Sequence, residues 1–164
     1  MKVIFLDIDG VLNICYPDRD NYGRLFHPEF VDNLRWIIEE TGAKIVISST
    51  WRFSGLQVMK EMWEKRNLPG DVIDITIDCY QYVEEGREEF YDKVERGHEI
   101  QHWLDEHQTE VTNYVILDDD NDFLTTQRGN FVRTSNNFNH PDCIDVGYGL
   151  TKICAERAIR ILNK

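Results

Sequence analysis

The chain begins with a short apolar run that leads directly into two carboxylates. Val3 to Leu6 are followed by Asp7, Asp9 and Gly10. A run of four branched or aromatic apolar residues predicts a strand that is buried on both faces, and the glycine marks the point where the backbone turns away. Both acids therefore lie at the carboxyl end of this strand. In open α/β sheets that edge binds ligands, because the loops that leave the strands diverge there.

Apolar strand-like runs alternate with amphipathic helical stretches along the rest of the chain. Further strands are expected over residues 43–47, 72–77, 114–117 and 130–134. Helices are expected over residues 28–41, 56–66 and 151–162, and the charged stretch 84–99 is expected to run from a loop into a helix with the apolar stripe Ile100, Trp103 and Leu104. This alternation predicts a mostly parallel, doubly wound sheet between two layers of helices, which is a three-layer α/β/α sandwich.

The size and composition of the chain favour one domain. With 164 residues, 41% of them apolar, the chain can bury one core, so we expect a single domain over residues 1–164. No stretch is long enough to span a membrane and the N-terminus has no signal-peptide pattern, which predicts a cytoplasmic protein. The net charge of −12 repels nucleic acid at long range, and no obligate protein partner is evident. Four widely spaced cysteines without a CxxC pair predict reduced thiols rather than a zinc site: Cys15, Cys79, Cys143 and Cys154.

Three of the predicted strand ends carry polar groups suited to chemistry. They are the acids Asp7 and Asp9, the hydroxyls of residues 48–50 and the acids of residues 118–120. If these strands lie side by side, carboxylates from the first and fourth strands meet at one point, with a hydroxyl beside them. Carboxylates that close cannot all stay ionised without a cation, and hard oxygen ligands in an open site favour Mg²⁺. Such a centre suits phosphoryl transfer, which depends mostly on positioning and charge neutralisation.

The same residues resemble the motifs of the haloacid dehalogenase (HAD) superfamily of phosphohydrolases. The segment Asp7-Ile8-Asp9-Gly10-Val11-Leu12 resembles the first motif, and Ser48 at the end of a strand is similar to the second. Arg96 stands where the third motif more commonly has lysine, and the pair Asp118-Asp119 resembles the fourth.

A closer resemblance is to the small HAD branch found as a module in Swiss Army Knife RNA repair-like proteins. It runs over nearly the whole chain. The residues that carry it are Ser49-Thr50-Trp51-Arg52, the stretch 96–104 and Gly149-Leu150-Thr151.

The resemblance implies a role for each of these residues. Asp7 would attack phosphorus and form an aspartyl-phosphate, while Asp9 would protonate the leaving oxygen and then deprotonate the hydrolytic water. Ser48 and Arg96 would bind the non-bridging oxygens. The full set of predicted phosphate ligands is Ser48, Ser49, Arg52 and Arg96, and the predicted Mg²⁺ ligands are Asp7, the Asp9 carbonyl, Asp118 and Asp119. Asp119 is favoured over Asp118 as the direct ligand, with Asp118 or Asp122 orienting ligands or bound water.

The resemblance also implies a phosphorylated substrate. Superfamily members often carry a lid domain, but residues 13–27 are too short for one and residues 53–95 are mostly taken by predicted elements. We therefore expect no separate cap domain and an open site, which admits the end of a large molecule such as a phosphorylated nucleic-acid end. A nucleotide or sugar phosphate is the alternative substrate. The residues available to line the approach, or else to be scattered surface groups, are Arg19, Arg24, Arg52, Arg87, Arg133, Tyr16, Tyr22 and Trp51.

Two alternatives from other functional classes remain open at this point. Residues 98–102 spell a literal HExxH motif, which on a helix places His98 and His102 on one face to bind zinc, with Glu99 beside them to activate water. That arrangement predicts a metallopeptidase. The other alternative is a non-catalytic binding module with a HAD fold. Substitution of Asp7 would leave the function of such a module unchanged.

Overall fold

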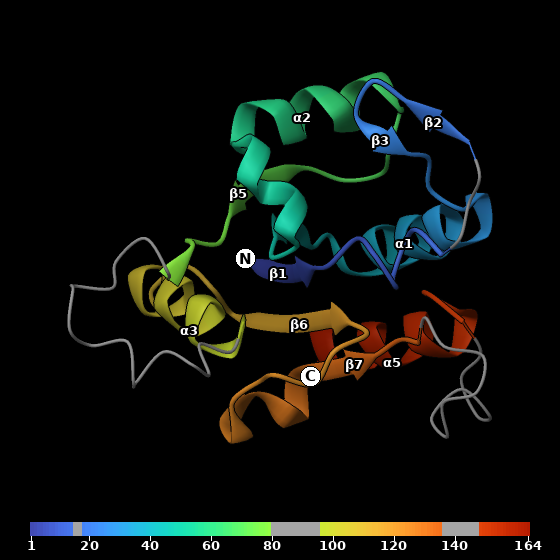
Figure 1. Cartoon of the computed structure of the whole chain (residues 1–164). Coiled ribbons are helices and arrows are strands. Elements are labelled where there is room, and N and C mark those ends of the chain that lie inside the picture. The colour runs from blue at the N-terminus through green and yellow to red at the C-terminus, as the bar shows by residue number, and fades with distance from the viewer. Residues whose placement is uncertain (15–17, 80–95, 136–147) are drawn as a thin grey trace.

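A parallel five-stranded sheet forms the centre of the fold. The computed structural model describes residues 1–14, 18–79, 96–135 and 148–164. The strand order is β5-β4-β1-β6-β7, and all neighbouring strands pair in parallel. In Figure 1 the arrows of β1 and β6 lie side by side and point the same way. The five strands are β1 (Lys2–Leu6), β4 (Lys44–Ile47), β5 (Val72–Ile75), β6 (Asn113–Asp118) and β7 (Phe131–Arg133).

Helices cover both faces of this sheet. The elements are α1 (Pro28–Thr41), α2 (Leu56–Lys65), α3 (Arg96–Glu106), α5 (Lys152–Leu162) and the short 3-10 helices η1 (Thr50–Ser54) and η4 (Thr125–Asn130). Ile4 of β1 belongs to one apolar cluster with buried residues of α1, α2 and α5. Its neighbour Phe5 belongs to a second cluster, together with Ile100 and Trp103 of α3. Because successive strand side chains point to opposite faces, this division confirms the predicted three-layer α/β/α architecture.

Local sequence signals explain where the helices begin and end. Pro28 occupies the first turn of α1, where its missing N–H costs no hydrogen bond. Gly42 ends that helix in the left-handed conformation (φ 66°), and its N–H bonds the carbonyl of Ile38. Thr151 caps α5, because its hydroxyl accepts from the backbone N–H of Cys154. The sequence therefore predicts these boundaries to within about a residue.

Two short features differ from the sequence prediction. Strand β5 ends at Ile75 rather than at residue 77, although the N–H of Thr76 still donates to Ile47 of β4. A hairpin of two-residue strands, β2 (Arg19–Asp20) and β3 (Gly23–Arg24), stands where only a turn-rich segment is predicted. Strands this short carry no alternating pattern that a sequence could reveal. Within the described residues between β1 and α1, the regular structure is this hairpin, and the expected lack of a cap domain stays a prediction.

Some predictions fall outside the described residues or are not tested by them. Residues 80–95, Cys15, Tyr16, Arg87 and Cys143 lie outside the described ranges, and the single domain over residues 1–164 stays a prediction. Cys79 and Cys154 are free thiols. Among the described residues, the helices are too short or too polar to cross a lipid bilayer.

Candidate active site

The carboxyl ends of the three central strands lie in register. The backbone N–H of Asp7 donates to Leu117 of β6 at 3.0 Å, and the N–H of Ser48 donates to Leu6 of β1 at 3.0 Å. Each bond continues the strand pairing by one residue past the end of β1 or β4. The sheet itself therefore places Asp7 between the end of β6 and the hydroxyl-bearing end of β4, as the parallel arrangement predicts.

Gly10 allows the chain to turn sharply after Asp7. The carbonyl of Ile8 accepts from the N–H groups of three residues, Val11 to Asn13, at 2.9 to 3.2 Å, and Gly10 has a φ of +80°. A Cβ atom at this position would lie 2.3 Å from the carboxyl carbon of Asp119. Only glycine satisfies both the backbone angle and the close approach of this carboxylate.

Three carboxylates gather beside this turn. Asp7, Asp118 and Asp119 each offer one oxygen atom, and these atoms lie within 4.8 Å of one another. Asp7 is 5% exposed and Asp118 is fully buried. Carboxylate oxygens in such a group suit Mg²⁺ as ligands. The group does not include the Asp9 side chain, whose predicted contribution to a metal is its backbone carbonyl.

Arg96, at the start of α3, is the cation of this cluster. Its Nη1 atom lies 3.3 Å from Oδ1 of Asp7 and donates a hydrogen bond to Oδ2 of Asp118. The second oxygen of Asp118 accepts from the backbone N–H of Asp120 at 2.9 Å. Both Asp118 oxygens therefore already have donors, and its predicted roles as a metal ligand or as an orienting group both stay predictions.

Asp122 fixes the position of Arg96 by holding the first turn of α3. Its carboxylate accepts from the backbone N–H of Arg96 at 3.2 Å, and its carbonyl accepts from Gly97 at 3.1 Å. A carboxylate at a helix N-terminus satisfies otherwise unpaired N–H groups and interacts well with the helix dipole. The sequence predicts that Asp122 orients ligands or bound water, and it carries no signal for this anchoring contact.

Burial shifts the ionisation of the whole cluster. Desolvation, followed by the charge of Asp118, raises the pKa of Asp7 to about 8, although Arg96 opposes the shift. Desolvation also raises the pKa of Asp118 to about 6, and burial and the Asp120 charge raise the pKa of Asp119. Burial alone would lower the pKa of Arg96, because it disfavours the charged guanidinium. The negative charges of Asp118 and Asp7 outweigh burial, so the pKa of Arg96 is raised. Fully ionised, the three acids carry more negative charge than Arg96 can balance, and this excess favours binding of a cation.

The stability of the metal-free protein is expected to fall as pH rises from about 4 to about 8. The pKa of Asp7 in the folded state lies above its ordinary value of 3.8, so the folded state keeps a proton that the unfolded state releases in this range. The stabilisation is complete below the ordinary pKa and is lost as pH passes through the folded value, at up to about 1.4 kcal/mol per pH unit for one proton. Urea unfolding at pH 5 and pH 8, with EDTA or with Mg²⁺, measures this. We expect Mg²⁺ to stabilise more at pH 8, and equal stabilisation at both pH values would contradict it.

The two serines at the end of β4 have different surroundings. The Ser49 side chain interacts with the Asp7 carboxylate and thereby opposes the rise in its pKa. The Ser48 side chain is fully buried, and among the described residues its hydroxyl has no hydrogen-bond partner. Successive residues at a strand end point to opposite sides, so one hydroxyl reaches the carboxylate and the other does not. Both were predicted phosphate ligands, and that role stays a prediction for each.

Arg52 connects the end of β4 to α3. Its side chain is 5% exposed, and its Nη2 atom pairs with Glu99 at 2.7 Å. Its Nη1 atom donates to the carbonyl of Ser48 at 2.9 Å. Burial raises the pKa of Glu99, although Arg52 lowers it. The guanidinium thus contacts protein acceptors on both sides, and its predicted role in binding phosphate is not tested by this geometry.

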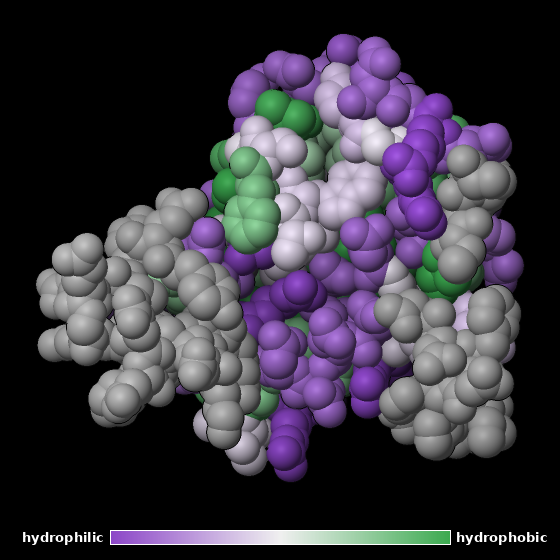
Figure 2. Space-filling model, viewed as in Figure 1, coloured by the Kyte–Doolittle hydropathy of each residue, from purple (hydrophilic) through white to green (hydrophobic). Residues whose placement is uncertain are grey.

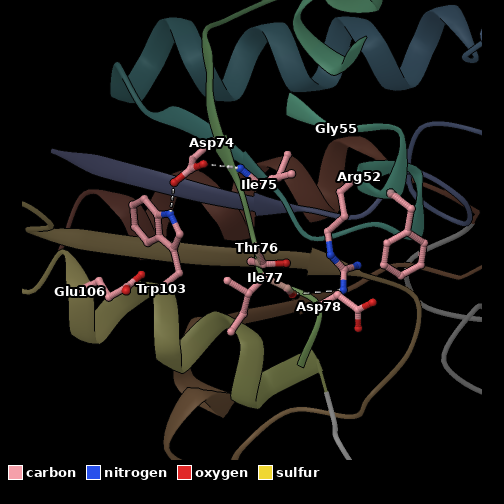
Figure 3. Close-up of a pocket in the computed structure, with 10 residues that line it drawn as sticks. Arg52, Gly55, Asp74, Ile75, Thr76, Ile77, Asp78, Trp103 and Glu106 are labelled. Atoms are coloured by element: carbon pink, nitrogen blue, oxygen red, sulfur yellow. Dashed lines mark hydrogen bonds between the residues drawn. The ribbon is translucent and has the colours of Figure 1, made fainter. Parts of the chain in front are cut away.

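A pocket of about 640 Å³ lies between η1, the chain that follows β5, and α3. Figure 3 shows Asp74 and Trp103 on one side of it and Arg52 and Asp78 on the other. The indole N–H of Trp103 donates to Asp74 at 2.7 Å. Asp74, Asp78 and Glu106 make its lining acidic, and none of the three clustered carboxylates lines it. The lining of this pocket therefore does not include the candidate metal centre.

The structure does not assemble the zinc site that the HExxH motif predicts. Glu99 is buried in its ion pair with Arg52, so it is not placed to activate water beside the histidines. His98 and His102 are exposed, and His102 lies 3.5 Å from Glu106. Within the described ranges, the group of side chains that could hold a metal is Asp7, Asp118 and Asp119.

Of the described residues predicted to line an approach, Arg52 is buried and the others are half-buried or exposed. Arg19 and Arg24 are exposed on the β2–β3 hairpin, and Arg133 donates to the carbonyl of Asp119 at 3.0 Å. Figure 2 shows that this face of the molecule is mostly hydrophilic, with a smaller hydrophobic group over the region of η1 and α2. Phe53 of η1 is 60% exposed.

Comparison with known proteins agrees with this geometry. No curated protein and no solved structure matches the chain significantly. The family model described as the HAD domain in Swiss Army Knife RNA repair proteins matches residues 3–139, which contain the whole acid cluster and Arg96. The chain therefore belongs to the HAD-domain family of the Swiss Army Knife RNA repair proteins.

Proposed function

We propose that this HAD phosphohydrolase domain is a Mg²⁺-dependent phosphomonoester hydrolase that works through an aspartyl-phosphate. The observation that carries the proposal is the meeting of Asp7, Asp118 and Asp119 within 4.8 Å, beside Arg96. These three acids and the Asp9 carbonyl would hold the ion. When bound, Mg²⁺ supplies positive charge that keeps the acids ionised and neutralises phosphate.

The chemistry of the chain's own residues follows from this placement. An oxygen of Asp7 attacks phosphorus, the bond from phosphorus to the leaving oxygen breaks, and Asp9 gives that oxygen its proton. Water then attacks the aspartyl-phosphate, Asp9 takes the water proton, and inorganic phosphate leaves. Arg96 and Ser49, which both contact Asp7, balance the charge on the non-bridging oxygens. Ser48, whose side chain is buried at the same strand end, would be a further donor to a non-bridging oxygen.

We propose terminal phosphates of nucleic acid as the substrate. The family takes its description from RNA repair proteins, and the exposed hairpin β2–β3 carries two arginines, Arg19 and Arg24. The acidic total of the chain works against a long nucleic-acid footprint, so we expect only a few phosphate contacts. A nucleotide or sugar phosphate is the second candidate, because the net charge of −12 disfavours a nucleic acid, which carries many phosphates, more than a small compound.

A substrate panel tests this proposal. Oligonucleotides with a 3′- or 5′-phosphate are assayed for phosphate release beside nucleotides and sugar phosphates, in Mg²⁺ and in EDTA. We expect turnover of oligonucleotides in Mg²⁺, none in EDTA, and a fall in turnover as salt rises because protein–phosphate contacts weaken. Faster, salt-insensitive turnover of a small compound would favour the second candidate. No turnover of any compound would favour a non-catalytic binding module.

A further inference from the structure

The predicted acid–base residue Asp9 is held by two N–H donors from outside its own strand end. The indole Nε1 of Trp51 donates to Oδ2 of Asp9 at 2.8 Å. The side-chain amide of Asn13 donates to Oδ1 at 3.0 Å. Asp9 is exposed, so without these donors its side chain would sample several rotamers in water. The two bonds engage both oxygens and select one orientation.

The ring of Trp51 is itself fixed by its neighbours. A Cβ atom on Gly23 of the β2–β3 hairpin would lie 3.2 Å from the far edge of the indole. The Phe26 ring lies 5.7 Å from the indole centroid, and the Arg66 guanidinium lies 5.8 Å above the ring. Arg66 also pairs with Asp20 of the hairpin. The indole therefore packs between the hairpin and Arg66, which follows α2, and this packing directs its N–H toward Asp9.

We propose that Trp51 is a positioning residue, which holds the Asp9 carboxyl in the orientation that delivers its proton to the leaving oxygen. The inference rests on the proposed function, because it assigns Trp51 to the acid–base step of that reaction. Correct orientation of a proton donor supplies a substantial part of general-acid catalysis, which is worth about 10²- to 10⁴-fold. The positioning role depends on the indole Nε1–H, whereas the rest of the ring packs against the hairpin.

Trp51→Phe keeps an aromatic ring and removes this N–H donor. A matched control is Trp63→Phe, because the Trp63 indole donates one hydrogen bond to the Pro69 carbonyl at 2.9 Å and its ring centroid lies 6.3 Å from that of Phe26. Each substitution removes one buried or half-buried indole and one hydrogen bond. A simple loss of packing therefore affects both variants, whereas loss of the Asp9 contact affects only the first.

The readout is kcat/KM for the best substrate of the panel and for its analogue with sulfur in place of the bridging oxygen. A thiolate leaves without help from a general acid, so kcat/KM for the sulfur analogue does not depend on Asp9 orientation. We expect Trp51→Phe to lower kcat/KM about tenfold for the oxygen substrate and less than about twofold for the sulfur analogue. Trp63→Phe is expected to change both less than about twofold. Asn13→Ala, which removes the other donor, is expected to behave like Trp51→Phe and keeps the test valid if that variant unfolds.

Asp9→Asn separates failure of this inference from failure of the proposed reaction. If Asp9→Asn shows no preference for the sulfur analogue, then Asp9 is not the general acid, and both the assigned reaction step and the role of Trp51 are wrong. Suppose that Asp9→Asn shows that preference, but Trp51→Phe and Asn13→Ala lower kcat/KM equally for both substrates or for neither. Then only the positioning role is wrong. Melting temperatures of all variants are measured under the same conditions.

Discussion

Asp7→Asn is expected to lower kcat/KM for phosphate release by about 10⁴-fold or more, because an amide oxygen is a far weaker nucleophile than a carboxylate. The side chain keeps its shape, and the backbone bond from Asp7 to Leu117 stays in place. The measurement is phosphate release in Mg²⁺ with the best substrate of the panel. Turnover within tenfold of the unchanged protein would contradict the nucleophilic role.

The same substitution is expected to stabilise the metal-free protein at pH 8. Asp7 is buried beside Asp118, and desolvation and this neighbour raise its pKa. Removing a buried charge that has a like charge beside it is expected to raise the free energy of unfolding by about 1 to 2 kcal/mol. Asp32→Asn, an exposed acid on α1, is the control and is expected to have little effect. Lower stability of the Asp7→Asn protein would mean that its contacts with Arg96 outweigh the burial penalty.

The second large effect concerns the buried pair of Arg52 and Glu99. Arg52→Met is expected to lower the free energy of unfolding by about 3 to 5 kcal/mol, because it leaves the Glu99 carboxylate buried without its cation. That is a large part of the 5 to 15 kcal/mol that stabilises a typical domain. The double variant Arg52→Met/Glu99→Met is expected to regain most of the loss. Urea unfolding at pH 7 measures both.

An exposed ion pair of the same protein is the matched control. Lys44 and Asp71 pair at the surface, with side chains 43% and 69% exposed, so Lys44→Met is expected to cost less than about 1 kcal/mol. The double variant also tests the predicted contact of Arg52 with phosphate. A stable double variant with full activity assigns Arg52 to the fold alone, whereas a stable but inactive one supports a contact with substrate.

Most of the fold can be predicted from short-range patterns in the sequence. The apolar run before Asp7 and the period of apolar residues in α1 predict strand and helix because burial in each element repeats with a fixed spacing. Pro28 and Gly42 mark the ends of α1 for local steric reasons. The hairpin β2–β3 escaped prediction because its pairing is two residues long and lacks any repeating pattern.

The candidate site was predictable in its members but not in their contacts. Asp7, Asp118 and Asp119 were expected to meet because each follows a buried strand of a parallel sheet, and the structure brings them together. The pairing of Arg52 with Glu99 had no sequence signal, since 47 residues separate them. The HExxH motif illustrates the same limit, because its glutamate is taken by that pair.

The sequence by itself determined the order of strands and helices and the residues at the strand ends, because these depend on local backbone preferences and on burial that repeats with a fixed period. Only the tertiary structure decided that Ser49 rather than Ser48 reaches Asp7, that Asp122 holds the start of α3, and that Trp51 reaches Asp9. These contacts depend on the angle at which each chain leaves its strand and on packing against distant segments. Neither this angle nor this long-range packing produces a repeating pattern in the sequence.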